Sequence, residues 1–559
     1  MLHKNSFSFI KCIRPLLVTT VIFLIAGCKV DTDNYEEATV YSITPFKKVT
    51  YQYKPTENES IDFCSINAVR GEYACSTFSI YAHKSLKDIS IRMTDLKSSK
   101  DLISRDNIDV RVVKVWKQSG DNMWVDEPVD VPELLLYDDS VILKGRRPSA
   151  GGISKIRTDI SKETSKQFWI TVKIPDDAKT GKYKGAVDVF ISGKKNKSIE
   201  LKVNVLPFKL VDPKKDFLIY YRAKLDPNSG VEYENEKDFI KQIENIKAHG
   251  FTGASIYSGK KYLTKILMLY QDVGFTSRIP YLGGPRDVVK TNNAIIKKNK
   301  LLPLMYYGLD EPNNPKKAEQ CRDMFLRIKE QGGVTTTAIK KKYADMIWDS
   351  IDVPIYSLCD PEIDAYIKGL NEGTINKNKK KELYYWQINK ERPKTARFMS
   401  GFYLWKSKLD GIFPYCYQML NTEDPYDDFT PWEWCGKKWR PHLVTYPSKE
   451  GPIDTLQWEA IIEGINDMKY IATLESYIDK LIPYNKVVKL KSIGTQKYLD
   501  IYKQNEKLIQ ESKNVLNYID SKINCDCLRA LEELTESDLV KFREMIVEQI
   551  LSCYNALKK

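Results

Sequence analysis

The chain has 559 residues, which is too long for one ordinary hydrophobic core, so we expect two or three domains. Its composition, with 42% hydrophobic and 29% charged residues, is typical of a soluble globular protein. The net charge of +13 comes from lysines spread among 74 acidic residues, without a dense basic stripe, and we therefore expect no nucleic-acid partner.

The first residues have the layout of a secretory signal. Lys4, Lys11 and Arg14 precede the apolar run 16–26. This run is shorter than the roughly 20 residues that a membrane-spanning helix needs. We therefore predict an export signal rather than a transmembrane helix.

The apolar run ends in Leu-Ile-Ala-Gly-Cys at residues 24–28, which resembles the lipobox of bacterial lipoproteins. The resemblance implies cleavage before Cys28 and lipid on its thiol and amine. The acidic stretch 29–34 resembles export signals of Bacteroidota surface lipoproteins. We predict a signal peptide at 1–27, a tether at 28–39 and a lipid-anchored protein of the bacterial cell envelope, on the surface or the periplasmic face of the outer membrane. The alternative is a plain signal peptide with a chance cysteine.

Cysteine and histidine usage argues against a metal site. Outside Cys12 and Cys28, nine cysteines are scattered over the chain and form no disulfide framework. His83, His249 and His442 have no ligand spacing to another histidine or to a cysteine. We expect no metal and no cofactor, and so few histidines also disfavour a Ser-His-Asp or Cys-His mechanism.

Residues 40–212 show short alternating segments separated by turn signals, as in a β-sandwich. Examples are 77–82, 110–116 and 168–172. The sandwich could be a carbohydrate-binding module, but we favour a scaffold packed on the next domain, because a fold alone does not define a function.

Residues 213–483 alternate between strand and helix patterns, which predicts a parallel sheet covered by helices. Eight strands are expected, and eight is the number that closes a (β/α)8 barrel of the TIM type. A last helix at 458–481 completes the barrel, and 484–559 reads as an amphipathic helical tail that packs on the rest. The expected strands are 217–221, 251–257, 275–282, 301–312, 334–339, 353–358, 383–387 and 411–417.

The fourth strand is a buried apolar run that ends in Asp310, Glu311 and Pro312. Catalytic residues of such barrels gather at the carboxyl ends of the strands, which favours a catalytic pair. The alternative is a surface turn that begins a helix, where acidic residues are common.

Adjacent residues leave an extended strand on opposite sides, so Asp310 and Glu311 cannot easily straddle a glycosidic bond. The seventh strand lacks a carboxylate at 385–389, and the next one is Glu391. Both observations favour substrate-assisted hydrolysis, in which a 2-acetamido group acts as the nucleophile. Asp310 would orient the acetamido N–H, and Glu311 would act as the general acid and base.

Aromatic and amide side chains near the strand ends favour a sugar site, because pyranose rings stack on aromatic faces. Each aromatic taken singly is more simply explained by core packing. The predicted substrate-binding residues are Tyr257, Tyr307, Trp386, Tyr415, Tyr417, Asn421, Trp432 and Trp434.

Several short motifs together resemble glycoside hydrolase family 123. They are 168–172 and 181–185 in the sandwich, 307–312 in the barrel, and 443–447 and 458–467 in the closing segment. The resemblance implies an exo-acting β-N-acetylgalactosaminidase that retains configuration, with Asp310 as the orienting residue and Glu311 as the acid/base.

We therefore predict a lipid-anchored exo-glycosidase that hydrolyses terminal β-linked 2-acetamido sugars, with β-GalNAc preferred. Its partners would be a glycan substrate and, through Cys28, a membrane. One alternative is a two-carboxylate glycosidase of other specificity, with Asp360, Glu362, Glu423 or Asp424 as the second carboxylate. The other is a non-catalytic glycan-binding lipoprotein.

Overall fold

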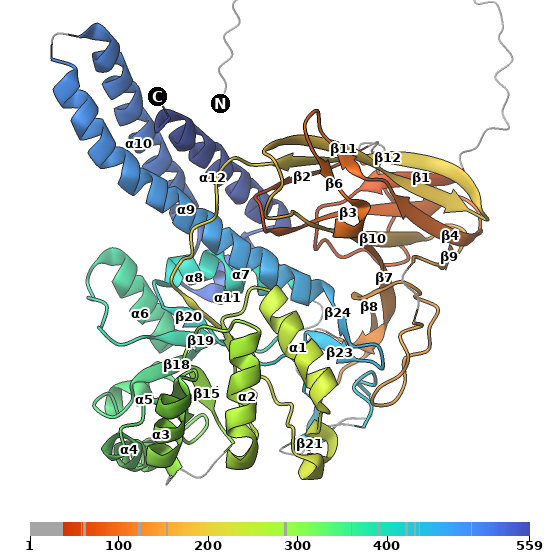
Figure 1. Ribbon diagram of the computed structural model, residues 1–559. Coiled ribbons are helices and arrows are strands. Elements are labelled where there is room, and N and C mark those ends of the chain that lie inside the picture. The colour runs from red at the N-terminus through yellow and green to blue at the C-terminus, as the bar shows by residue number, and fades with distance from the viewer. Residues whose placement is uncertain are drawn as a thin grey trace, which may run out of the picture.

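A β-sandwich, a barrel and a set of long helices pack together in the protein (Figure 1). The structure is a computed structural model, and it describes residues 37–56, 59, 63–120, 124–152, 155–283, 288–358, 360–388, 392–419, 423–429, 432–434, 437–493 and 495–558. The predicted signal peptide and Cys28 lie outside these residues.

The sandwich consists of two antiparallel-rich sheets whose inward residues form one core. Buried and exposed side chains alternate along the strands and so place the apolar residues in this core. In β2, for example, every second residue is buried. Phe78 and Phe168 stack across paired strands with ring centroids 5.0 Å apart. The first sheet has the order β1 (Ala38–Ser42), β3 (Tyr73–Ala82), β10 (Ser165–Lys173), β7 (Ile108–Ser119) and β8 (Pro128–Leu136). The second has the order β2 (Phe63–Ala68), β12 (Lys194–Val205), β11 (Gly181–Ile191), β4 (Leu86–Met93) and β9 (Thr158–Ile160), with β5 (Leu96–Lys97) and β6 (Leu102–Ile103) beside β11.

The barrel contains eight parallel strands in sequential order, and the two ends of the sheet meet in a bridge between Ile256 and Tyr281. Strand residues are buried because helices cover the outside and side chains fill the inside. The strands are β13 (Asp216–Ile219), β14 (Gly253–Ala254), β15 (Ile279–Tyr281), β16 (Leu304–Tyr307), β17 (Thr335–Ile339), β18 (Val353–Ser357), β19 (Leu383–Tyr385) and β20 (Gly411–Ile412).

Helices alternate with the barrel strands, and several begin at the residues that sequence preference favours. The side chains of Asn235 and Asn314 accept hydrogen bonds from the first turns of α1 and α4, and Pro315 opens α4. The helices are α1 (Glu236–Ala248), α2 (Lys260–Asp272), α3 (Val289–Asn299), α4 (Pro315–Glu330), α5 (Lys341–Met346), α6 (Pro361–Glu372), α7 (Pro393–Ser400) and α8 (Phe402–Ser407). After β20 come two hairpins, β21 (Trp432–Trp434) with β22 (Lys437–Trp439) and β23 (Thr445–Pro447) with β24 (Pro452–Asp454).

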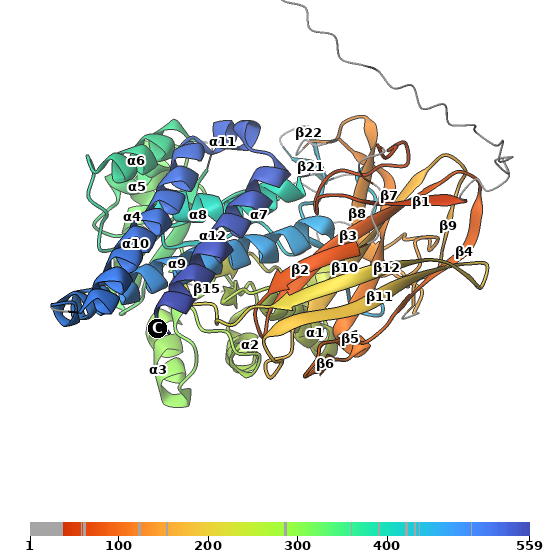
Figure 2. The ribbon, with the colours of Figure 1, turned by 90° about the horizontal axis from the view of Figure 1, so that it is seen from above.

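The last part of the chain is helical and is continuous with the barrel. Helix α9 (Leu456–Lys491) runs through the predicted domain boundary at residue 483 without a break. It forms a projecting hairpin with α10 (Gln496–Lys522), and α12 (Glu536–Ala556) packs against both (Figures 1 and 2). The short helix α11 (Cys527–Glu533) connects α10 to α12.

Helix α9 also joins the sandwich to the barrel. Its Gln457 and Tyr470 donate hydrogen bonds of 2.8 Å to Glu133 and Glu72 of the sandwich, respectively. On its other side, buried Asp467 pairs with Arg397 of α7 at 2.8 Å and with Arg543 of α12 at 2.5 Å. Buried charges are stable only when they are paired and hydrogen-bonded, so these contacts hold the three parts in one arrangement.

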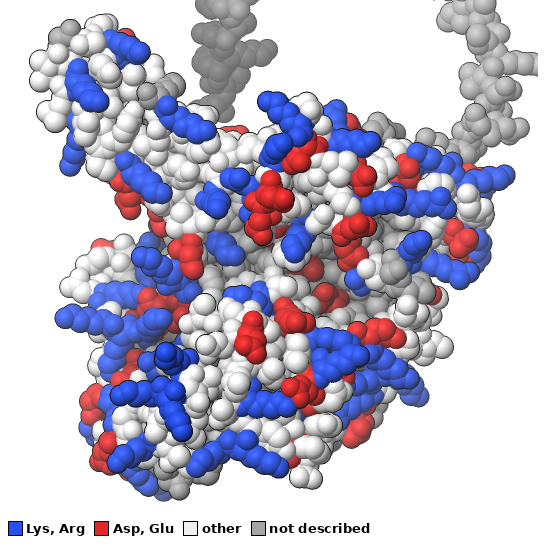
Figure 3. Space-filling view, in the orientation of Figure 1, with Lys and Arg blue, Asp and Glu red and all other residues white. Residues whose placement is uncertain are grey.

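Basic and acidic side chains are intermixed over the face shown in Figure 3. Among the residues that the structure describes, no helix has the length and apolar character needed to span a membrane. The predicted fold class is confirmed: a β-sandwich, an eight-stranded barrel and a C-terminal helical region follow one another.

Candidate active site

The segment after β16 is fixed tightly to its neighbours. A Cβ atom at Gly308 would lie 2.5 Å from the ring of Phe325 and 3.0 Å from Cys321 Sγ, so α4 can pack here only against glycine. The carbonyl of Leu309 accepts a 2.7 Å hydrogen bond from Thr337 Oγ1. Glu311 adopts the left-handed backbone conformation, with φ of 44°, and its N–H donates to the carbonyl of Ala338 at 3.2 Å. These contacts hold the two carboxylates at the carboxyl end of the barrel.

Asp310 and Glu311 line a cavity of about 360 Å³ at this end of the barrel. Contributions come from strands on several sides, as is usual for a barrel active site. The lining residues are Tyr220, Arg222, Tyr257, Leu282, Tyr307, Gly308, Asp310, Glu311, Ala338, Tyr385, Gln387, Tyr415 and Trp439.

A chain of hydrogen bonds orients Asp310. Tyr307 Oη donates to Asp310 Oδ1 at 2.7 Å. Tyr307 Oη also accepts a hydrogen bond from the backbone N–H of Ala338 at 2.9 Å. The Tyr307 hydroxyl has one proton, which it gives to the hydrogen bond with Asp310. In the 2.8 Å hydrogen bond between Tyr220 and Tyr307, the Tyr220 hydroxyl is therefore the donor. Tyr220 therefore donates to Tyr307, and Tyr307 donates to the Asp310 carboxylate.

Desolvation by the surrounding cavity walls raises the pKa of Asp310 above its ordinary value, although the residue itself is exposed, and the neighbouring charge of Glu311 raises this pKa further. The Tyr307 hydrogen bond and the positive charge of Arg222 act in the opposite direction. Asp310 thus binds its proton more tightly than an ordinary aspartate does.

Glu311 lies between the cavity and a second hollow. Tyr385 donates a hydrogen bond to Glu311 Oε1. Glu311, Tyr385 and Gln387 also line a neighbouring space of about 770 Å³, which we call the outer groove. Glu311 is therefore part of the lining of both spaces.

Arg222 is the basic residue among the described residues that line the cavity. Its Nε donates to Glu232 Oε1 at 2.8 Å, and its guanidinium lies 5.1 Å from the ring centroid of Tyr257. Sequence reasoning missed this residue, although it follows Leu218 and Tyr220 at the two-residue period of an inward strand face.

Trp439 closes another side of the cavity and connects it to the sandwich. Its Nε1 donates to His442 Nε2 at 2.5 Å, while His442 Nδ1 lies 3.2 Å from the carbonyl of Ile388. The ring centroid of Trp439 lies 5.9 Å from that of Trp124, which belongs to a loop of the sandwich. His442 therefore fixes an aromatic wall of the cavity.

The predicted substrate-binding residues fall into three groups. Tyr257, Tyr307 and Tyr415 line the cavity, and Trp386 lines the outer groove. Tyr417 departs from the prediction: it is fully buried and donates to Asn245 Oδ1 at 3.1 Å, outside the cavity lining. Asn421 and the side chains of Trp432 and Trp434 lie outside the described residues.

The alternative second carboxylates do not line the cavity. Asp360 caps α6 and lies 3.5 Å from Lys340, and Glu362 lies 3.5 Å from Lys342. Glu423 is exposed, and Asp424 accepts a 3.0 Å hydrogen bond from the N–H of Tyr426. Glu391 lies outside the described residues. Among the described residues that line the cavity, Asp310 and Glu311 are the two carboxylates.

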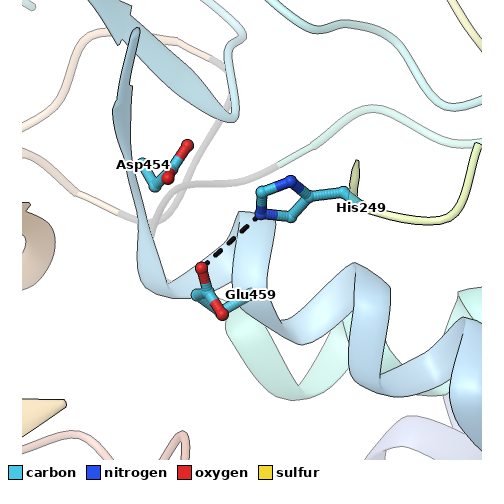
Figure 4. A group of neighbouring side chains, drawn as sticks. All are labelled: His249, Asp454 and Glu459. Atoms are coloured by element: carbon cyan, nitrogen blue, oxygen red, sulfur yellow. Dashed lines mark ion pairs between the residues drawn. The ribbon is translucent and has the colours of Figure 1, made fainter. Parts of the chain in front are cut away.

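His249, Asp454 and Glu459 form a separate group with metal-ligating atoms, where α1, β24 and α9 meet (Figure 4). His249 Nδ1 lies 2.9 Å from the carbonyl of Asn245, and its Nε2 lies 3.5 Å from Glu459 Oε1. The pKa of His249 is raised; burial opposes this, but Glu459 and Asp454 outweigh it. The group lies within the packing of the fold, and its residues are not part of the cavity lining.

Comparison with protein families gives two matches from the same family. The model of the glycoside hydrolase 123 N-terminal domain matches residues 46–191. The model of the glycoside hydrolase 123 catalytic domain matches residues 287–474. Together they cover more than half of the chain. The comparison with curated proteins gave no match.

Among solved structures, the chain is similar to a family 123 glycoside hydrolase from Clostridium perfringens, whose structure was analysed for the details of glycolipid glycan hydrolysis. The TM-score is 0.60 at 12% identity, over 91% of this chain and 99% of that one. A family 39 glycoside hydrolase from Bacteroides cellulosilyticus matches with a TM-score of 0.31 at 10% identity, over 64% of this chain and 80% of that one. The similarity to the Clostridium perfringens enzyme shows that the two proteins share a fold.

Proposed function

Because this chain belongs to glycoside hydrolase family 123 and is a glycosidase, we propose that it removes terminal β-linked 2-acetamido sugars, preferentially β-GalNAc, from glycans by a retaining, substrate-assisted mechanism. The observation that carries the proposal is the placement of the cavity's two carboxylates on adjacent residues of one segment. A retaining two-carboxylate mechanism needs its acid and its nucleophile on either side of the bond, roughly 5 Å apart, and an inverting one needs an acid and a base roughly 6.5 to 9.5 Å apart.

In the first step the acetamido carbonyl oxygen attacks the anomeric carbon, and the bond from that carbon to the leaving oxygen breaks. Glu311 gives its proton to the leaving oxygen, while Asp310 accepts a hydrogen bond from the acetamido N–H and balances the positive charge that develops there. The products of this step are a free leaving group and a bicyclic oxazolinium ion, whose N–H stays hydrogen-bonded to the Asp310 carboxylate.

In the second step Glu311, now a carboxylate, takes a proton from water. The water oxygen attacks the anomeric carbon from the face that the leaving group vacated, and the oxazolinium ion opens to restore the acetamido group. Two inversions give a sugar with retained β configuration.

Three features support a sugar in the cavity. Its volume of about 360 Å³ suits one sugar unit, in agreement with exo action. Tyr257, Tyr415 and Trp439 supply aromatic walls, which pyranose faces contact well. Arg222 supplies charged donors for sugar hydroxyl groups.

A panel of aryl glycosides tests this function. We expect release of the aryl group from the β-GalNAc substrate, and none from the β-galactoside that lacks only the acetamido group. Equal rates on both would overturn substrate assistance and favour a two-carboxylate glycosidase. Binding of glycans without hydrolysis of any member would favour the non-catalytic alternative.

Replacing Tyr307 by phenylalanine tests the positioning of Asp310. The change removes the hydrogen bond that lowers the pKa of Asp310, so this pKa rises further. Because Asp310 acts as a carboxylate, activity is lost as pH falls through its pKa, and the acid limb of kcat/KM moves to higher pH in the variant. We also expect kcat/KM to fall roughly tenfold, since hydrogen bonds to charged groups are strong.

Tyr306 provides the matched control for this experiment. It is the preceding residue of β16, and its hydroxyl donates to Asn293 Oδ1 at 3.0 Å, away from the cavity. Tyr306→Phe should leave the pH profile unchanged. An identical shift in both variants would show that general destabilisation, rather than Asp310, causes it.

We further propose that the protein is held in the bacterial cell envelope by lipid on Cys28. Support comes from the sequence at 24–28, which resembles a lipobox. Replacing Cys28 by serine should move the protein from the membrane fraction to the soluble fraction. Continued membrane association of that variant would contradict the anchor.

A further inference from the structure

The group formed by His249, Asp454 and Glu459 has the donor chemistry of a transition-metal site. Its ligand atoms, one imidazole nitrogen and two carboxylate oxygens, all lie within 4.8 Å of one another. Figure 4 shows one edge of the His249 ring directed toward the two carboxylates. Zinc binds imidazole nitrogen and carboxylate oxygen, whereas calcium and magnesium take oxygen ligands. The donor set therefore fits zinc and similar divalent ions of the first transition row.

The distances within the group suit a tetrahedral ion. Two ligands of such an ion lie roughly 3.3–3.6 Å apart when each metal–ligand bond is about 2.0–2.2 Å long. His249 Nε2 and Glu459 Oε1 are 3.5 Å apart, which is within this range and long for a direct hydrogen bond. Asp454 is less buried than the other two residues, and a rotation of its side chain would bring its carboxylate to the same distance.

The hydrogen bonds behind the group orient its ligands as a metal site requires. His249 Nδ1 donates to the backbone carbonyl of Asn245 at 2.9 Å, so the lone pair of Nε2 in the neutral ring faces the carboxylates. Metal-binding histidines almost always have such a partner on their other nitrogen. The Asn245 amide also donates to Asp454 Oδ1 at 2.9 Å, and its own oxygen is held by Tyr417 and Trp458. One asparagine thus orients two of the three ligands.

The charges of the group favour a bound cation. Glu459 pairs with His249, and the charge of Asp454 acts on the same imidazole, so two carboxylates share one ring. Arg111 of the sandwich also acts on Asp454, but its guanidinium pairs with Asp109 at 2.7 Å. Charges removed from water are costly unless they are balanced. A divalent ion bound to a neutral imidazole would balance both carboxylates.

We propose that His249, Asp454 and Glu459 bind one zinc ion, or a similar divalent transition-metal ion, as a structural cross-link. The ligands come from the end of α1, from β24 and from the first turn of α9. More than 200 positions separate His249 from Asp454, which is why ligand spacing along the sequence does not indicate the site. The ion would join the first helix of the barrel to the segment after its last strand, and cross-links that close long loops are expected to stabilise a fold most. The inference does not depend on the proposed function, because the three residues lie outside the cavity lining.

Titration of the full chain with Zn²⁺ alone, after treatment with a chelator and in competition with a chromogenic chelator, tests the proposal. We expect a site of one ion per chain, and a Kd that rises at least about tenfold in Glu459→Gln, because a ligand is lost. Asp454→Asn changes the least buried ligand and should weaken binding likewise, while circular dichroism reports whether each variant is folded. Free Zn²⁺ at roughly 100 times Kd should raise the Tm of the unaltered protein by about 2 °C, and the Tm of neither variant.

Co²⁺ in place of Zn²⁺ identifies the donor atoms in the unaltered protein, because cysteine thiolates bind zinc as well. The first equivalent of Co²⁺ should give visible ligand-field bands without the near-ultraviolet charge-transfer band of a thiolate ligand. His83→Gln is the matched control, because His83 is an exposed histidine of the sandwich whose Nε2 lies 2.7 Å from Thr39 Oγ1. This variant should bind Zn²⁺ as the unaltered protein does. A thiolate band at the first equivalent, a site that persists in both ligand variants, or no binding by the unaltered protein would overturn the inference.

Discussion

Replacing Glu311 by glutamine is expected to lower kcat on an oligosaccharide substrate by about 10²- to 10⁴-fold, the range typical of lost general acid–base catalysis. Glutamine keeps the size of the side chain but can neither donate the proton to the leaving oxygen nor take one from water. Substrates with a very acidic phenol need no protonation of the leaving group, so their first step should be less affected. For such substrates added azide should restore turnover, because azide attacks without needing a base.

The product of the azide reaction makes this test specific to Glu311. Capture of the intermediate by azide should give a β-glycosyl azide, since the second inversion still occurs. Glu319→Gln is the control, because Glu319 lies on α4 with a half-exposed side chain and is 3.7 Å from Arg322. Glu311 would not be the acid/base if the Glu311 variant kept full activity on the oligosaccharide. The same conclusion would follow if azide failed to restore turnover of the acidic phenol substrate by this variant.

Replacing Asp310 by asparagine is expected to lower kcat on β-GalNAc substrates by roughly 10²- to 10³-fold, as for other lost electrostatic contacts to a transition state. The amide still fits the site, but it no longer balances the charge on the acetamido nitrogen as the oxazoline forms. KM should change little, because the interaction strengthens mainly in the transition state.

A thiazoline analogue of the oxazoline gives a second measurement for Asp310. Its inhibition constant should rise about as much as kcat falls, because the analogue carries the same ring nitrogen. Asp349→Asn is the control, because this exposed carboxylate pairs with Arg322 at 2.6 Å on the surface. Unchanged inhibition of the Asp310 variant would contradict the orienting role even if its kcat were reduced.

The strand count and the placement of the carboxylates could be read from the sequence for one reason. Both depend on local patterns, namely runs of apolar residues, turn signals and the position of a residue relative to a strand end. Asp310 and Glu311 line the cavity as that interpretation expects. Strand β16 ends at Tyr307, however, and Glu311 has a left-handed backbone, so the pair lies in the loop after the strand and not on its extended end. Their catalytic roles stay predictions.

Tyr417 shows where such a local argument fails. Tyr415 and Tyr417 would share one face if the strand continued, because side chains alternate along a strand. The strand β20 ends at Ile412, however, and Tyr417 lies at a bend of the chain, so the alternation does not continue to it. Tyr415 therefore faces the cavity, while Tyr417 packs against Trp458 of α9, with ring centroids 5.5 Å apart.

The outer groove depends on contacts that no local pattern reveals. Its lining includes Leu528 of α11 and Asp126 of a sandwich loop. Leu528 lies more than 200 positions after Glu311 in the sequence, and Asp126 lies nearly as far before it. The sequence predicts that the helical tail packs on the rest of the chain, because its amphipathic pattern describes only its buried face. The position of its exposed face depends on where α11 is anchored, which the sequence of α11 does not state.

The unbroken course of α9 through the predicted boundary also limits how this enzyme can evolve. Domain exchange between genes requires a boundary that few contacts cross. Here one helix begins beside the sandwich, covers the barrel and ends in the C-terminal hairpin, and Asp467 at its middle pairs with residues of two other helices. A recombination event at the C-terminal end of the barrel would separate Asp467 from Arg543 and leave charges unpaired in the core. One at the N-terminal end would separate α9 from Glu72 and Glu133 of the sandwich. New specificities are therefore expected to arise by change within loops and short helices such as α11, rather than by the gain or loss of whole modules.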